Sequence, residues 1–370
     1  MKLAFLIFSL ICPGICFGAE AKSDLRGASR HTAPEQSRVI YVTDKLATTN
    51  FTPQKARLPD MIHRGIMALC ETNSPEAAWH SLFSPQDIIG IKVYSAPGPV
   101  GGTRPMVVAS LVESLLSAGF QASQIVIWDK RRPHLEDAGF IALGRRLGIR
   151  VTSSEEAGYD PTVFYESSVL GRLIWGDSEF SRHHEDYRSP REDEEPPTKP
   201  VMLQQSPHNY GRKSFVSNLL TRQITKILNV TPLLNHNTAG VAGNLFSLAS
   251  GSVDNILRFE QNQTLEATAL PEIYALPEIS EKVALNIVDA LICQYEGEVQ
   301  PRLNYATPLN QLRFSKDPVA LDVLSVFELD RQRRIAKREV KKPYLEPYIN
   351  AGLMDLGNSE PRLIHIEEAP

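Results

Sequence analysis

Apolar residues follow two patterns along the chain, short continuous runs and helical spacings. The runs "DIIGIKVYS" (87–95) and "QIVIWD" (124–129) are typical of strands that are buried on both faces of a sheet. Between them, the apolar spacing of "PMVVASLVESLLSAGF" (105–120) predicts an amphipathic helix that stops near a glycine. A helix over about 135–147 and a strand at "IRVTS" (149–153) follow. Strand, helix, strand, helix and strand in this order predict an α/β fold with a mostly parallel sheet flanked by helices.

Similar patterns before and after this unit predict further elements. The additional strands are expected at "RVIYVTD" (38–44), "QITKILNVTPLL" (223–234), "KVALNIVDAL" (282–291) and "PRLIHIEEAP" (361–370). A helix is expected over 60–71 from its apolar spacing. Another begins after Asp317, which can cap it, because Pro318 suits the first turn of a helix.

The first residues of the chain form a segment of their own. Lys2, an apolar run over 3–17 and small residues after it predict a secretory signal peptide over 1–19. We therefore expect an exported protein, periplasmic or extracellular, with no stable membrane anchor after cleavage. Residues 20–37 are polar and predict a flexible leader, and residues 38–370 form the α/β domain.

One internal segment, residues 177–200, departs from both apolar patterns. It reads "DSEFSRHHEDYRSPREDEEPPTKP", which is highly charged, rich in proline and almost free of apolar residues. Such a composition cannot bury enough apolar surface to fold by itself. We predict a charged, disordered insertion on the surface of the domain.

Charge and cysteine content exclude several classes of function. The 370 residues carry a net charge of -4, so no basic field favours nucleic acid as a partner. There is no C-x-x-C, and no iron–sulfur cluster is expected, while other cofactors stay unknown. After signal cleavage Cys70 and Cys293 remain; they either pair in a disulfide or stay buried and free. The oligomeric state stays open.

The first candidate site lies around the loop 95–103, which follows a predicted buried strand. In open α/β sheets, ligands bind beyond the carboxyl ends of the strands. A glycine-rich loop that leads into a helix offers backbone N–H groups to an anion. Thr103 would cap the helix and Arg104 would pair with a carboxylate or phosphate; a plain connecting loop is the alternative.

Two charged residues of the buried strands are further candidates. Lys92 lies inside an apolar strand, where a lysine needs a partner or shifts its pKa. It is either a catalytic or anion-binding group or the partner of a structural carboxylate. Asp129, at the end of the next strand, would orient a hydroxyl group or serve a turn.

The stretch "NHNTAGVAGNLFSLASGSVDNILRF" (235–259) holds the third candidate site. His236, flanked by Asn235 and Asn237, follows a predicted buried strand and is a candidate acid–base group or ligand-binding group. Asp254 and Arg258 are four residues apart and are expected to share one helical face as ligand-binding residues. A structural role for His236 is the alternative.

Three further aspartates, Asp289, Asp317 and Asp322, could converge with His236 at one edge of the sheet. Asp317 is more simply a helix cap, and none of the three is diagnostic by itself. No metal site is predicted, because the chain offers only scattered aspartates as further ligands.

Six segments of the chain together resemble the domain-of-unknown-function 362 family. They are, in order, "DIIGIKV", "TRP" at the start of a helix, "IVIWDK", "TKILNVTPLLNHNTAGVAG", "GSVDNILRF" and "DPVALD". The resemblance covers the chain from about residue 38 and implies an α/β fold of unassigned activity. Some members carry a ferredoxin-like segment with cysteine-ligated clusters, and this chain lacks those cysteines.

The chain differs from the family pattern close to the candidate sites. Where many members read "LKDH" and "LKN", this chain has Leu234, Asn235 and Phe246, so both lysines are replaced. Tyr94 stands where an asparagine usually follows "IKV". The lead hypothesis is a small-molecule site for an anionic ligand, with acid–base or metal-assisted chemistry. The alternative is a non-catalytic binding or interaction protein that has lost the family's lysines.

Overall fold

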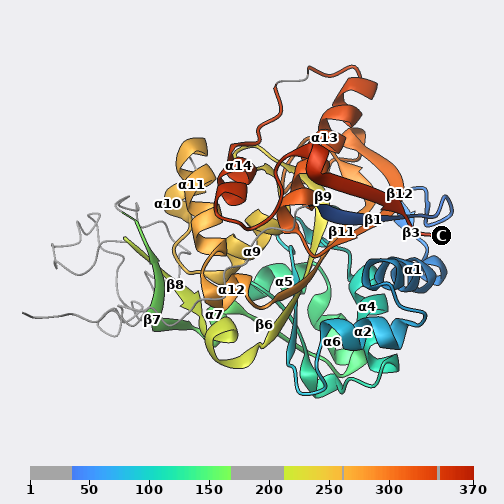
Figure 1. The fold of residues 1–370 in the computed structure, drawn as a ribbon, viewed down its shortest axis with the longest axis horizontal. Helices are drawn as coiled ribbons and strands as arrows, with labels where there is room; N and C mark the ends of the chain where they lie inside the picture. Colours follow the sequence, from blue (N-terminus) through green and yellow to red (C-terminus); the bar gives the residue numbers. More distant parts are fainter. Residues whose placement is uncertain (1–35, 168–211, 261, 340–341) are drawn as a thin grey trace, which may run out of the picture. The chain divides into compact units, whose positions relative to one another are not determined.

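A computed structural model describes residues 36–167, 212–260, 262–339 and 342–370 of the chain (Figure 1). The predicted signal peptide (1–19), nearly all of the leader (20–37) and the charged insertion (177–200) lie outside the described residues. Strand β1 begins at Ser37, one residue before the predicted start of the domain. Within the described ranges, no helix is long and apolar enough to cross a membrane.

The described residues form a nine-stranded, mainly parallel sheet, as predicted. Its strand order is β13-β1-β12-β11-β9-β4-β5-β6, and β10 pairs with β9. These strands are β1 (Ser37–Thr43), β4 (Ile89–Val93), β5 (Ile125–Asp129), β6 (Arg150–Ser153), β9 (Lys226–His236), β10 (Gly240–Val241), β11 (Val283–Gln294), β12 (Ala306–Ser315) and β13 (Ile364–Glu368). The five neighbours from β11 to β6 are all parallel, so their carboxyl ends lie at one edge.

Helices cover both faces of this sheet, which explains the continuous apolar runs of its central strands (Figure 1). In β4, Ile89 and Ile91 pack on one face, whereas Lys92 faces the other. The first face is covered by α1 (Leu58–Cys70), α2 (Pro75–Leu82), α4 (Pro105–Ser117) and α6 (Phe140–Leu147). The second is covered by α9 (Asn244–Ser252), α11 (Gln263–Tyr274), α13 (Pro318–Ile335) and α14 (Glu346–Leu353).

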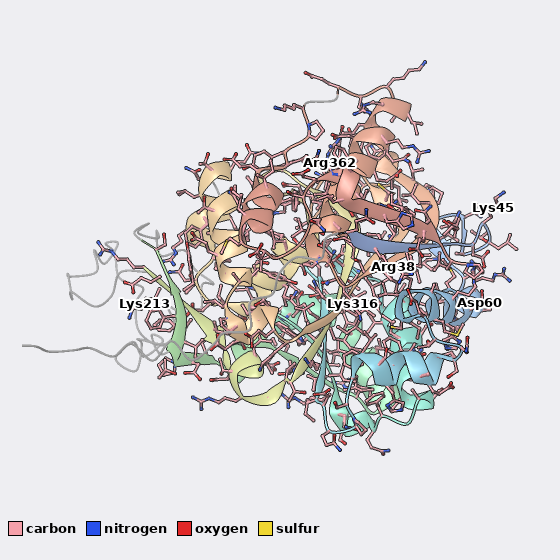
Figure 2. All side chains as sticks on the ribbon, viewed as in Figure 1. Arg38, Lys45, Asp60, Lys213, Lys316 and Arg362 are labelled. Carbon is pink, nitrogen blue, oxygen red and sulfur yellow. The ribbon has the colours of Figure 1, made fainter. Side chains whose placement is uncertain are left out.

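Charged side chains lie mostly at the periphery of the described residues. Figure 2 shows Lys45 and Asp60 at the edge of the molecule, and both are exposed, as is Arg362. The exceptions are a few charged groups buried on the second face and at the carboxyl edge of the sheet, beginning with Lys92 and Asp322. These exceptions position the candidate site.

The structure adds strands that the apolar pattern did not predict. Strand β12 runs antiparallel to β1 and β11, and its first half is only partly buried, so it has no continuous apolar run. Strands β7 (Tyr159–Glu166) and β8 (Lys213–Ser217) form an antiparallel pair on either side of the segment that holds the insertion. The shorter elements are β2 (Thr48–Thr49), β3 (Thr52–Pro53), α3 (Gly98–Gly101), α7 (Ser154–Ala157), α10 (Leu257–Glu260) and α12 (Pro277–Ser280).

The single helix expected over 135–147 is wrong, because the structure has two. Helix α5 (Arg132–Asp137) ends before Gly139, and α6 begins at Phe140. Gly139 has a φ of 89°, a left-handed conformation that interrupts a helix and that glycine adopts at little cost.

The N-terminus of α9 receives its hydrogen bonds from a distant carboxylate. Asp322 of α13 accepts from the backbone N–H groups of Asn244 and Leu245 at 2.7 and 2.8 Å, and from Asn244 Nδ2 at 2.9 Å. A Cβ at the preceding residue, Gly243, would lie 2.2 Å from Asp322 Oδ1, so only glycine allows this approach. Asp322 therefore caps the N-terminus of α9, although it lies 78 residues away in the sequence.

A second buried aspartate, Asp317, caps α13 as predicted. Its Oδ1 accepts from the backbone N–H of Ala320 at 2.8 Å. Its Oδ2 accepts from the Ser37 hydroxyl and from the backbone N–H of Asn358, so it also joins the two ends of the domain. Neither Asp317 nor Asp322 converges with His236, because each is used by a helix N-terminus.

Cys70 and Cys293 do not pair, so of the two alternatives the free thiols are correct, although Cys70 is only partly buried. Cys293 is buried on the second face of the sheet, whereas Cys70 packs with the first. Burial raises the pKa of the Cys293 thiol to about 12, which keeps it protonated and inert.

The Asp322 cap leads to a test of stability. The Asp322→Ala variant leaves the N–H groups of Asn244 and Leu245 buried without a partner, so we expect a loss of about 2–4 kcal/mol in the free energy of unfolding. Urea denaturation measures it, with Asp137→Ala, an exposed aspartate of α5, as the control. A loss no larger than that of the control would contradict the role of Asp322.

Candidate functional site

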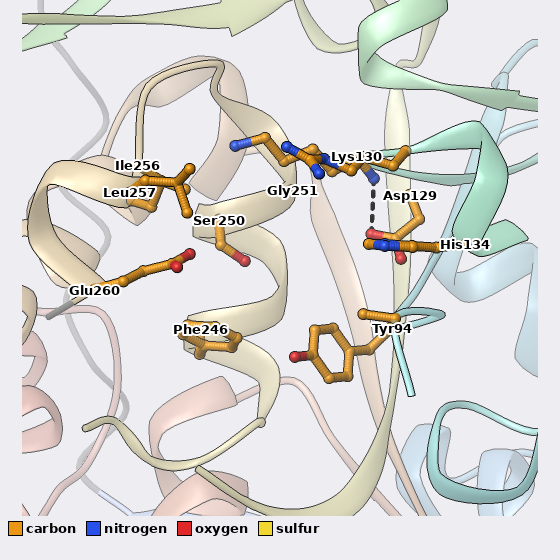
Figure 3. A pocket seen from close by; sticks show the side chains of 12 residues that line it. Tyr94, Asp129, Lys130, His134, Phe246, Ser250, Gly251, Ile256, Leu257 and Glu260 are labelled. Carbon is orange, nitrogen blue, oxygen red and sulfur yellow. Dashed lines mark hydrogen bonds between the residues drawn. The ribbon is translucent and has the colours of Figure 1, made fainter. Parts of the chain in front are cut away.

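A cavity of about 270 Å³ lies at the carboxyl ends of β4 and β5, beneath α9 and α10 (Figure 3). We call it the β4–β5 cavity. Its apolar wall is formed by Tyr94, Ala96, Phe246, Gly251, Ile256 and Leu257. Its polar lining consists of Asp129, Lys130, Arg131, His134, Ser250 and Glu260. The location is the edge at which ligands bind in open α/β sheets, as the sequence predicts.

Beside this cavity, Lys92 and Asp129 form a buried ion pair. Lys92 Nζ lies 2.9 Å from Asp129 Oδ1 and donates to the Val93 carbonyl oxygen at 2.7 Å and to Ser247 Oγ at 3.0 Å. These three partners account for the three N–H donors of the ammonium group. A Cβ on Gly251 would come within 2.3 Å of Lys92 Cε, so the glycine of α9 makes room for the lysine. Lys92 is thus the partner of a structural carboxylate.

Asp129 has a full set of hydrogen-bond donors. Besides Lys92, it accepts from the Ser95 N–H at 2.8 Å, the Ser95 hydroxyl at 2.5 Å and the Lys130 N–H at 2.8 Å. Burial alone would raise the pKa of this carboxyl, but the charge of Lys92 and the Ser95 hydrogen bonds outweigh it and lower the pKa. Asp129 is therefore a carboxylate that fixes the β4 loop to the end of β5.

The loop 95–103 is also held by internal contacts. Thr103 Oγ1 accepts from the Tyr94 N–H at 2.9 Å and donates to the Val230 carbonyl oxygen at 2.7 Å. Arg104 Nη1 lies 2.9 Å from Asp289 Oδ1, and Asp289 Oδ2 accepts from the Arg104 N–H at 3.3 Å. Asp289 therefore occupies the N-terminus of α4, where the sequence suggested an external anion.

Glu260 is the acidic group of the cavity that the structure leaves without a partner. Within the described residues, nothing hydrogen-bonds or ion-pairs with its carboxylate. Burial raises the pKa of Glu260, against the effect of Lys130 and Arg131, which lower it. In Figure 3 its carboxylate points into the cavity from α10, opposite Asp129 and His134.

Tyr94 and Phe246 form the aromatic part of the wall. Their rings meet edge to face with centroids 5.9 Å apart. In Figure 3 the Tyr94 hydroxyl and the Ser250 hydroxyl point toward the middle of the cavity. The Tyr94 hydroxyl has no hydrogen bond to any other described residue.

Two cations, Lys130 and Arg131, follow Asp129 in the chain. Lys130 Nζ donates to the Asp254 carbonyl oxygen at 2.8 Å, and Arg131 Nε lies 3.2 Å from Glu155 Oε1. Both side chains are only partly exposed and line the cavity. The lining thus carries two cations, Lys130 and Arg131, and two carboxylates, one of which is already paired with Lys92.

His236 does not join this group and lines a separate, charged cavity of about 760 Å³. Its ring lies against Phe246, with centroids 4.1 Å apart, and its Nδ1 accepts from the Ala239 N–H at 3.1 Å. Burial lowers the pKa of His236 to about 4, so the ring is neutral near pH 7. The candidates Lys92, Asp129 and His236 therefore do not gather around one cavity.

The asparagines beside His236 hold a neighbouring loop. Asn235 Oδ1 accepts from the Glu298 N–H at 3.1 Å, and the Asn237 N–H donates to Glu298 Oε1 at 2.8 Å. The two residues thus fix Glu298, in the loop after β11, to the end of β9. Neither lines the β4–β5 cavity.

Asp254 and Arg258 do not share a helical face, because Asp254 precedes α10, which begins at Leu257. Asp254 Oδ1 accepts from the backbone N–H groups of Phe215 and Asn255, each at 2.7 Å. Arg258 Nη2 donates to Ser214 Oγ at 2.9 Å. Both residues therefore join α10 and its preceding turn to β8.

Glu266 of α11 is a buried acid that the sequence pattern did not single out. Its side chain is fully buried, and neither oxygen has a well-formed hydrogen bond within the described residues. Burial raises its pKa from 4.5 to about 7, and the nearby Thr238 hydroxyl lowers it in part. The charges of Glu260 and Glu298 raise it further.

Sequence reasoning missed Glu260, Ser250 and His134 as cavity residues. Glu260 ends the segment "NILRFE", in which nothing distinguishes it from Arg258 two residues earlier, so the sequence carries little signal for it. Ser250 and His134 carry no signal, because only the packing of α9 and α5 over the sheet brings them to the cavity. Within the described ranges, no three His, Cys, Asp or Glu residues are placed to hold a metal ion.

Comparisons with known proteins identify no family. No protein-family model and no curated protein matches the chain. A crystal structure of a protein from Thermotoga maritima, a target of the Northeast Structural Genomics Consortium, is similar with a TM-score of 0.40 and 11% sequence identity. The alignment covers 78% of this chain and 60% of that protein, so the chain spans about three fifths of its length. A likeness of this extent carries no argument about function.

The Lys92–Asp129 pair predicts a strong coupling between two substitutions. Lys92→Met leaves Asp129 buried with an uncompensated charge, so we expect a loss of about 3–5 kcal/mol in the free energy of unfolding. The double variant Lys92→Met/Asp129→Asn removes both charges and should recover at least about 1 kcal/mol of this loss. Urea denaturation of the parent protein, Lys92→Met, Asp129→Asn and the double variant measures the coupling free energy between the two groups. Additive losses would show that the two groups do not interact.

Glu266 predicts a pH dependence of stability. Between about pH 4.5 and 7 the unfolded chain has released this proton and the folded chain still holds it, so stability falls as the pH rises. Glu266→Gln removes this fall and should raise the free energy of unfolding at pH 8 by about 1–3 kcal/mol. Denaturation across this pH range measures it. Glu136→Gln, an exposed substitution on α5, is the control and should follow the parent protein.

Proposed function

We propose that the chain binds a small organic anion in the β4–β5 cavity. The acidic group of the ligand faces Lys130 and Arg131, and its apolar part lies against Tyr94 and Phe246. The observation that carries this proposal is the combination of two cations with an aromatic wall at the carboxyl edge of the sheet.

The size of the cavity limits the ligand to a small metabolite. Its volume of about 270 Å³ lies just below the range of about 300–1,000 Å³ that is usual for ligand pockets. The N-termini of α4 and α9 are not available to the ligand, because Asp289 and Asp322 occupy them. The side chains of Lys130 and Arg131 supply the positive charge instead.

Of the two functions considered from the sequence, binding without catalysis is better supported. Lys92, Arg104 and Asp129 are each used in buried ion pairs, which leaves them without a free proton donor or acceptor for a substrate. Under the proposed resemblance to the domain-of-unknown-function 362 family, Tyr94 and Phe246 replace an asparagine and a lysine. Their contact supports a site whose lysine chemistry has been exchanged for an aromatic wall. We propose that the protein acts outside the cytoplasm, after removal of residues 1–19.

Calorimetric titration with hydrocinnamate and isocaproate, two small acids with apolar tails, tests the proposal. Saturable binding at a stoichiometry of one is expected. The Lys130→Gln/Arg131→Gln double variant should bind at least about tenfold more weakly, since each charge-assisted contact contributes on the order of 1.5 kcal/mol. The absence of binding to the parent protein would refute the proposed function.

Arg132→Gln is the matched control for this titration. Arg132 follows Arg131 in the chain and carries the same charge, but it is exposed and does not line the cavity. Its variant should bind both acids like the parent protein. Equal losses in the control and the double variant would mean that only the general charge of the surface matters.

A further inference from the structure

We infer that the ligand of the β4–β5 cavity is a zwitterion, an amino acid or a similar molecule with an ammonium group beside its acidic group. This inference rests on the proposed binding of an anion and adds a second charge of opposite sign. The residue that carries it is Glu260, a carboxylate that points into the cavity without a partner among the described residues.

Charged groups of both signs line the cavity, and they come from two elements. Lys130 and Arg131 follow Asp129 at the end of β5, and Lys130 Nζ reaches the Asp254 carbonyl oxygen in the turn before α10, whereas Glu260 belongs to α10 itself. The lining is formally balanced, with two cations and two carboxylates. An anion alone would add a negative charge to a cavity that holds the Glu260 carboxylate, whereas a zwitterion offers the cations and the carboxylate a charge of opposite sign each.

The aromatic wall of the cavity also suits an ammonium group. The Tyr94 and Phe246 rings lie beside the space that Glu260 faces, and aromatic faces attract cations. The Tyr94 and Ser250 hydroxyl groups, which point into the same space, can accept hydrogen bonds from N–H groups.

Asp129 cannot take the place of Glu260 in this role. Its two oxygens accept from Lys92, Ser95 and Lys130, and a ligand ammonium group would have to displace one of these donors. Glu260 has no such competitor within the described residues. The proposal therefore assigns the ammonium group to Glu260 and the acidic group to Lys130 and Arg131.

Three ligands with one carbon skeleton test the inference. Phenylalanine carries both charges, hydrocinnamate lacks the amino group, and phenethylamine lacks the carboxylate. We expect phenylalanine to bind at least about tenfold tighter than either, because each loses one charge-assisted contact. Leucine, isocaproate and isoamylamine form a second set for a smaller side chain. Calorimetric titration of the full mature chain measures all six.

The Glu260→Gln variant makes the test specific for the residue. It should bind phenylalanine at least about tenfold more weakly and bind hydrocinnamate as tightly as the parent protein or more tightly. Glu136→Gln should leave all affinities unchanged. Circular dichroism and the melting temperature confirm that both variants are folded.

The outcomes separate this inference from the proposed function. If hydrocinnamate binds as tightly as phenylalanine, or if Glu260→Gln weakens both equally, the zwitterion is wrong and the anion site stands. If the amines bind and neither acid does, both proposals are wrong. If none of the six compounds binds, both are likewise refuted.

Discussion

The buried ion pair between Lys92 and Asp129 is the interaction on which the carboxyl edge of the sheet depends. A lysine in a central strand can remain charged only if the fold supplies a carboxylate and further acceptors. Asp129, Ser247 and the Val93 carbonyl oxygen meet this need, and Gly251 leaves space for the side chain. One charge in β4 thereby ties β4, β5 and α9 together. These contacts hold in place the residues that form the floor of the cavity.

The fold also supplies partners for buried charges and N–H groups at the helix N-termini. Asp289 at α4, Asp322 at α9 and Asp317 at α13 each place a carboxylate where N–H groups lack helical partners. In many α/β proteins such N-termini bind the phosphate or carboxylate of a ligand. Here the chain occupies them itself, so the fold keeps the usual location of the site but changes the groups that can recognise a ligand.

The side chains that line the cavity supply its chemistry. Lys130 and Arg131 carry positive charge although each also contacts the protein, Glu260 carries negative charge, and Tyr94 and Phe246 form an aromatic surface. The proposed recognition of a ligand depends on these charges and on the size of the cavity. His236 belongs to a different cavity and stays neutral, so the histidine that the sequence makes prominent is not part of this arrangement.

The sequence by itself determined the class of the fold, the central strands and the edge of the sheet at which a site lies. These follow from local periodicity, because an apolar run or a helical spacing reports which faces of an element are buried. Lys92 and Asp129 were identifiable as well, since charges in or beside such runs need partners. Tertiary structure alone decided the pairings, because Lys92 and Ser247 lie 155 residues apart and Asn244 and Asp322 lie 78 apart. It also decided that Glu260 remains unpaired within the described residues, since packing of α10 over the sheet, and no local pattern, sets what each carboxylate meets.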